Sequence, residues 1–112
     1  MPNNRKKGKV IERWFATALR PIFPDVRRNA GEQAQSGGRD LENTGILSIE
    51  VKGGKQYKSK MVRSVLDQAQ QEAGKNMWAV ALMKPDREDP YAMMPFDDFM
   101  EMLAVMKKEG IV

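Results

Sequence analysis

The chain has 112 residues, of which 41% are apolar and 30% charged, as expected for one folded domain around a single hydrophobic core. It contains neither cysteine nor histidine, which excludes disulfides, thiol nucleophiles, thiolate or imidazole zinc sites and histidine general bases. Any enzyme built from this chain must therefore use carboxylates, lysine, hydroxyls or a hard metal ion bound by oxygen.

Positive charge is concentrated in the first part of the chain. Residues 1–63 hold 14 Lys and Arg against 6 Asp and Glu, a net charge of +8, whereas residues 64–112 hold 5 against 9, a net charge of −4. This asymmetry is typical of a protein with one side that faces a polyanion such as DNA, although a solvated basic surface has the same composition. The candidate DNA-binding residues are Lys6, Lys7, Lys9, Arg27, Arg28, Arg39, Lys55, Lys58, Lys60 and Arg63.

The N-terminal region predicts an arm followed by a helix. Residues 1–8 are polar and basic, so we expect a flexible basic arm ahead of a single domain over residues 9–112. Residues 9–20 carry apolar side chains at helical spacing, which predicts an amphipathic helix that ends before Pro21. No apolar run is long enough to span a membrane, and none follows the basic arm as in a signal peptide.

The next segment predicts two or three strands. A weak strand is expected around Val26, and a loop or short strand around residues 40–41, after a stretch rich in Gly, Gln and Asn. Residues 46–52 are the clearest strand, because apolar and polar side chains alternate along them. Leu47, Ile49 and Val51 should face one side of this strand, and Ser48, Glu50 and Lys52 the other.

The second half of the chain predicts two helices and a buried strand. Residues 58–73 read as a helix, and the apolar run 77–84 as a central strand covered on both faces. A short segment through residues 93–94 precedes a last helix with Asp97 or Asp98 at its start and Gly110 after its end. We therefore expect an α/β fold in which helices flank a small mixed β-sheet.

One group of residues predicts chemistry. Glu50 and Lys52 should share a strand face, and a hairpin would bring Asp40 opposite Glu50. Two carboxylates at that separation, with the backbone carbonyl of Val51, would form an oxygen-lined site for Mg²⁺ or Mn²⁺. Such a metal promotes phosphodiester hydrolysis, and a neighbouring lysine can hold the nucleophile or the phosphate. Taken alone, Glu-x-Lys is also an ordinary charge pattern of a solvated strand.

The stretch "RDLENTGILSIEVKGG" resembles the signature of the PD-(D/E)XK nuclease superfamily, in which Asp precedes Glu-x-Lys by about ten residues. "KGKVIERWF", "LDQAQQEAGKNMWAVALMKP" and "YAMMPFDDFMEML" are similar to segments of archaeal and phage Holliday-junction resolvases. The resemblance spans roughly residues 7–106. One departure is Arg39, which stands where the superfamily often has proline immediately before the aspartate.

The resemblance implies a restriction-endonuclease-like core of the order αβββαβα and a Mg²⁺-dependent endodeoxyribonuclease that acts on branched or duplex DNA. It implies catalytic roles for Asp40, Glu50 and Lys52, and adds Glu12 from the first helix to the metal site. It also implies a homodimer that cuts two strands symmetrically, in the cytoplasm of a bacterial or phage-infected cell. Gln68, on the helix after the lysine, is a candidate supporting residue.

Two other functions remain open at this point. The chain could be a non-catalytic nucleic-acid-binding module that keeps a nuclease-like fold, since the same basic surface would serve it. It could also be an interaction protein whose methionine-rich last helix, with Met102 and Met106, contacts a partner.

Overall fold

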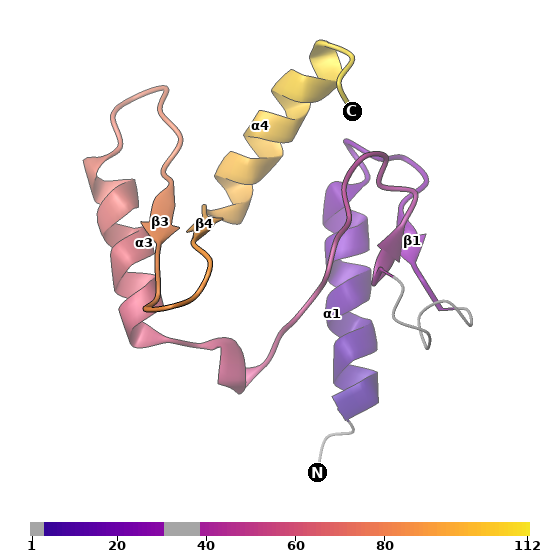
Figure 1. Ribbon diagram of the computed structural model, residues 1–112. Coiled ribbons are helices and arrows are strands. Elements are labelled where there is room, and N and C mark those ends of the chain that lie inside the picture. Colours follow the sequence, from indigo (N-terminus) through magenta and orange to yellow (C-terminus); the bar gives the residue numbers. More distant parts are fainter. Residues whose placement is uncertain (1–3, 31–38) are drawn as a thin grey trace. The chain divides into compact units, whose positions relative to one another are not determined.

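The computed structural model describes residues 4–30 and 39–112 (Figure 1). Within these residues the fold is α/β, with three α-helices and two antiparallel sheets of two strands each. The chain divides into two compact units: the first comprises Met1–Tyr57 and Met106–Val112, and the second comprises Lys58–Val105. None of the described helices is both long and apolar enough to cross a bilayer.

The first unit is built on helix α1 (Asn4–Leu19), which packs against strand β1 (Arg27–Arg28). Strand β2 (Leu41–Glu42) pairs antiparallel with β1, and the short 3₁₀ helix η1 (Lys55–Tyr57) follows later in the chain. The buried side chains of this unit are Ala16, Leu19, Ile22, Phe23, Val26, Leu41 and Thr44.

Helix α1 begins earlier than the sequence predicts. Residues 4–8, assigned to the basic arm, form its start, and the prediction of one domain over residues 9–112 stays a prediction. The helix buries Ala16 and Leu19, whereas Val10 and Trp14 are 59% and 60% exposed.

The predicted strand over residues 46–52 is not part of a sheet in the described structure. β1 pairs with β2 instead, and a single backbone hydrogen bond, from Asp40 N to Ile49 O (3.2 Å), ties residues 46–52 to the Asp40 region. The backbone N–H of Val51 donates to the Asp40 side chain and not to a backbone carbonyl of a neighbouring strand. A side-chain acceptor thus replaces the backbone acceptor that strand pairing would require.

The second unit contains helix α3 (Lys60–Glu72), strands β3 (Ala81–Met83) and β4 (Tyr91–Met93), and most of helix α4 (Phe96–Lys108). Ser59 caps α3 by accepting a hydrogen bond from Val62 N at 3.3 Å, so the helix predicted over residues 58–73 is confirmed with slightly shorter bounds. Helix α4 begins at Phe96, one residue before the predicted start. The Asp98 carboxylate in its first turn accepts a hydrogen bond from Ala79 N at 2.9 Å, which joins the helix to the segment before β3.

The predicted central strand is wrong in its length and its surroundings. Only residues 81–83 of the apolar run 77–84 form a strand, which pairs antiparallel with β4 as a hairpin. Ala79 and Ala81 are buried, but Val80 and Leu82 are 48% and 79% exposed, so only one face is covered. The described residues thus contain two separate antiparallel pairs where one mixed sheet was predicted, and the restriction-endonuclease-like core stays a prediction.

Candidate active site

Asp40 lies between two other segments of the first unit. Its backbone carbonyl accepts a hydrogen bond from Asn29 N at 2.9 Å, and its backbone N–H donates to Ile49 O at 3.2 Å. Its carboxylate Oδ2 accepts from Val51 N at 2.6 Å. A short hydrogen bond from a backbone N–H to a carboxylate is stronger than one between neutral groups. Residues distant in sequence therefore fix the Asp40 carboxylate next to residues 49–51.

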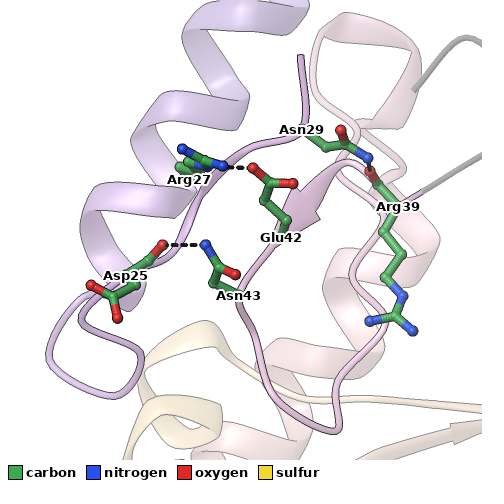
Figure 2. A network of polar contacts seen from close by, with 6 residues as sticks. All are labelled: Asp25, Arg27, Asn29, Arg39, Glu42 and Asn43. Carbon is green, nitrogen blue, oxygen red and sulfur yellow. Dashed lines mark hydrogen bonds and ion pairs between the residues drawn. The ribbon is translucent and has the colours of Figure 1, made fainter. Parts of the chain in front are cut away.

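A network of polar contacts holds the segments on either side of Asp40 (Figure 2). Arg27 and Glu42 form an ion pair, and Asn43 Nδ2 donates to Asp25 O at 2.9 Å. Asn29 Nδ2 donates to the carbonyl of Arg39 at 3.0 Å. Figure 2 shows the Arg39 guanidinium pointing away from this network. The Arg39 backbone thus helps to place Asp40, and its side chain is exposed to solvent.

A cavity of about 250 Å³ adjoins Asp40. Four predicted residues of the catalytic and metal site line it, namely Glu12, Asp40, Val51 and Lys52, whereas Glu50 is not among its lining residues. Helix α1 contributes Glu12 together with Gly8, which lies one turn before it on the same helix face. The full set of lining residues is Lys7, Gly8, Glu12, Asp40, Val51, Lys52, Gly53 and Tyr57.

The carboxyl group of Glu50 interacts with that of Asp40. A hydrogen bond with the Asp40 carboxyl, and then repulsion by its negative charge, raise the pKa of Glu50. The Lys52 ammonium opposes this rise, and the Glu12 carboxylate adds to it. Two carboxyl groups so close together favour a proton or a cation between them.

Glu12 lines the cavity, but its carboxylate is held by an arginine. Arg28 Nε donates to Glu12 Oε2 at 2.8 Å, and both side chains are about four-fifths buried, with exposures of 18% and 20%. Among the described residues, no three acidic side chains are grouped closely enough to hold a metal ion. In this arrangement Asp40 and Glu50 form the carboxylate pair, and Glu12 is paired with Arg28.

Gly53 allows helix α1 to approach residues 50–53. A Cβ atom at Gly53 would overlap Cδ1 of Ile11 and lie 3.1 Å from its Cγ1. The absence of a side chain at Gly53 thus makes room for the Ile11 side chain. This close packing places Glu12, the residue after Ile11, on the same cavity as Lys52.

The remaining predicted basic residues are distributed over both units. In the first unit, Lys7 lines the cavity, Lys9, Arg39 and Lys55 are exposed, and Lys6 lies outside the side chains that the structure describes. Lys58, Lys60 and Arg63 belong to the second unit, where Arg63 pairs with Asp67 at 3.1 Å.

Gln68 also belongs to the second unit, and its amide donates to Glu72 Oε1 at 3.2 Å. Its predicted supporting role stays a prediction.

Sequence reasoning did not select Tyr57, nor Lys7 as a residue of this cavity. Gly8 lies four residues before Glu12 and shares its helix face, but Lys7 lies five residues before it, so helical spacing gave no signal for Lys7. No local pattern marked Tyr57, which comes from η1.

Comparison with known protein families, with curated proteins and with solved structures finds no match to this chain. A function for this chain is therefore inferred from its residues and their geometry.

Proposed function

We propose that the protein is a divalent-metal-dependent endodeoxyribonuclease that hydrolyses phosphodiester bonds. The observation that carries this proposal is the Asp40–Glu50 carboxyl pair, of which Asp40 lines a cavity together with Lys52. Without cysteine or histidine, a hard metal ion on two carboxylates is the chemistry that this set of side chains supports best.

The donor set fits Mg²⁺ or Mn²⁺. Mg²⁺ is commonly bound through one or two carboxylates, and fills its remaining positions with water and with phosphate oxygens of the substrate. Asp40 and Glu50 would supply the two carboxylates, and the Val51 carbonyl is a further oxygen at the same cavity. The ion would lower the pKa of a nearby water and offset negative charge on the phosphate.

The chain's own residues would then have separate roles. Asp40, fixed by three hydrogen bonds, sets the position of the site. Glu50 would hold the cation together with Asp40. The Lys52 ammonium pairs with the phosphate or holds the nucleophile, since it lies at the same cavity and its charge already acts on Glu50.

Action on branched DNA, in the manner of a junction resolvase, is the specific form of this proposal. Its support is the resemblance of the Asp40 to Lys52 stretch and of the flanking segments to that group of nucleases. Two symmetric cuts require two sites, so this form of the proposal includes a homodimer, which light scattering measures directly.

Cleavage of labelled four-way junctions, flaps and duplexes with Mg²⁺ or Mn²⁺ tests the proposal. Asp40→Asn is preferred to Asp40→Ala, because the amide keeps an oxygen acceptor for Val51 N–H while it removes the charge. We expect Asp40→Asn, Glu50→Gln and Lys52→Met each to lower the cleavage rate by at least about a hundredfold. Lys75→Met and Glu88→Gln, exposed positions in the second unit, are the matched controls.

Calorimetric titration of the DNA-free protein with Mn²⁺ gives an independent readout. Binding should be lost in Asp40→Asn and Glu50→Gln and kept in Lys52→Met, because lysine is not a ligand. A Lys52→Met variant that cleaves as fast as the parent protein would show that the site assignment is wrong.

A non-catalytic DNA-binding module is the second candidate. The observation that favours it is the capture of Glu12 by Arg28, which leaves two carboxylates rather than three for a metal among the described residues. Salt-sensitive DNA binding with neither Mn²⁺ binding nor product after long incubation would select this candidate.

A further inference from the structure

The first unit contains a second cavity, of about 390 Å³, whose lining is rich in arginine. Helix α1 contributes Arg13 and Arg20, and strand β1 contributes Arg27 and Arg28. The other lining residues are Ala16, Thr17 and Ala30. We call this the arginine cavity.

Helix periodicity explains how α1 supplies its share. Arg13, Thr17 and Arg20 are spaced four and three residues apart, so they lie along one face of the helix. The same helix packs against β1, whose two residues are both arginines, and this places cationic side chains on two sides of the cavity.

The charges around the arginine cavity are not balanced. Arg27 and Arg28 have carboxylate partners, Glu42 and Glu12, and neither carboxylate lines the cavity. Arg13 and Arg20 form no ion pair with any residue in 4–30 or 39–112. Among the described residues, four guanidinium groups with two carboxylate partners leave a net positive charge at a concave, partly apolar site.

We propose that the arginine cavity binds a backbone phosphate of the DNA strand. Guanidinium groups present planar pairs of N–H donors that match phosphate oxygens, and they stay charged at any physiological pH. The Thr17 hydroxyl is a further donor at the same site. The preference for a phosphate oxyanion follows from the arginines, whereas its assignment to DNA rests on the proposed nuclease function.

The two cavities share a connection that suits one nucleic acid strand. Glu12 lines the candidate active site and Arg28 lines the arginine cavity, and these two residues form the buried ion pair between them. A strand with its scissile phosphate at Asp40 and Lys52 would thus place a neighbouring phosphate at the arginine cavity. The cavity would hold the strand in register for cleavage.

The test is DNA affinity as a function of salt, measured by fluorescence anisotropy on a labelled duplex with Ca²⁺ in place of Mg²⁺. The double variant Arg13→Gln/Arg20→Gln should bind at least about tenfold more weakly than the parent protein. The slope of log K against log salt should fall by up to about 1.8, since each lost phosphate contact removes about 0.9. Neither arginine has an ion-pair partner among the described residues, so the variant should keep the parent's Tm.

A matched control removes the same amount of charge elsewhere. Lys75→Gln/Lys84→Gln lies in the second unit, where both lysines are exposed, and should change the affinity by less than about twofold. An equal loss of affinity in both double variants would overturn the proposal, because it would reduce the arginine cavity to general surface charge. Arg13→Lys/Arg20→Lys should retain only part of the parent protein's DNA affinity, since lysine keeps the charge but lacks the planar pair of N–H donors.

Other outcomes separate this proposal from the nuclease assignment. If the parent protein does not cleave DNA but Arg13→Gln/Arg20→Gln lowers its DNA affinity, the arginine cavity is supported and the proposed nuclease function is wrong. If cleavage depends on Asp40 and Lys52 while Arg13 and Arg20 leave affinity and its salt slope unchanged, the arginine cavity fails alone. Competition by millimolar inorganic phosphate or a mononucleotide, with no effect of Arg13→Gln/Arg20→Gln on DNA, would assign the site to a free phosphate and reject a DNA phosphate.

Discussion

At the residue scale, the main feature is a carboxyl pair that costs stability. Two acidic groups that interact closely are unfavourable when both are ionised, and the neighbouring Asp40 carboxyl raises the pKa of Glu50. Val51 N–H donates to the Asp40 carboxylate.

The first prediction concerns Glu50→Gln and pH. Because its pKa is raised in the folded protein, the folded state binds the Glu50 proton more tightly than the unfolded chain does. The contribution of Glu50 to stability is therefore most favourable below its ordinary pKa, and it decreases as pH rises through the interval up to the raised value. Metal-free Glu50→Gln should have a higher Tm than the parent protein at pH 7, and the difference should shrink toward pH 4.

Thermal melts in EDTA at several pH values measure this effect. Glu88→Gln, an exposed glutamate of the second unit, should give no pH-dependent difference. A Glu50→Gln variant that is less stable than the parent at pH 7 would contradict the prediction. A gain in stability at a residue required for Mn²⁺ binding would identify Glu50 as a group kept for function.

At the element scale, the position of α1 depends on one contact. Ile11 packs onto Gly53, where a Cβ would overlap its side chain. Rotation about χ2 can move Cδ1 of Ile11 aside, but Cγ1 and Cγ2 would lie 3.1 and 3.2 Å from the added Cβ, and the stiff χ1 of Ile restricts their movement. This contact holds the helix that carries Glu12 next to the segment that carries Lys52.

The second prediction is that Gly53→Ala destabilises the protein by about 1–3 kcal/mol, as overpacking typically does. Ile11→Val removes the overlapping Cδ1, so Gly53→Ala/Ile11→Val should recover part of that loss. Chemical denaturation measures both values. Gly8→Ala is the control, since a Cβ at Gly8 meets nothing within 4 Å. Equal stability of Gly53→Ala and Gly8→Ala would show that the packing is looser than the structure indicates.

The sequence predicts helices better than strands in this protein, for physical reasons. Helix periodicity is local, so the predicted range 58–73 agrees with α3 to within two residues at its start and one at its end. In the structure Ser59 caps this helix. Strand pairing depends on a distant partner, which local alternation does not specify. Residues 46–52 alternate as a strand does, yet the side chain of Asp40 takes the N–H of Val51.

Much of the candidate site was also predictable from sequence. The period of two along residues 50–52 and the upstream Asp40 identified a carboxylate pair with a lysine, and the structure brings these residues together. The pairing of Glu12 with Arg28 was not predictable, because it joins residues of a helix and a strand through tertiary packing. The sequence shows only that Arg13 and Arg20 lie on one helix face. Their role in a cavity follows from the packing of β1 against that helix.

At the scale of the whole molecule, charge and chemistry coincide in sequence. Both cavities are lined by residues of the first unit, between Lys7 and Tyr57, where the chain is most basic. DNA attracted by this positive region would arrive at the two sites rather than at the more acidic remainder.

The third prediction follows from this charge distribution. DNA affinity should fall by about tenfold or more between roughly 50 and 200 mM KCl, because bound phosphates release counterions. Anisotropy titrations at four salt concentrations give the slope. An affinity that does not change with salt would rule out both the DNA-binding surface and the arginine cavity.

The ion pair between Glu12 and Arg28 has a thermodynamic consequence for cooperativity. A phosphate that competed for Arg28 would loosen Glu12, and the Glu12 charge would then add to the attraction of a cation at Asp40 and Glu50. If phosphate binding raised the affinity for the cation by some factor, cation binding would raise the affinity for the phosphate by the same factor. Under the proposed function, the protein would therefore bind a metal ion most tightly when DNA is already bound.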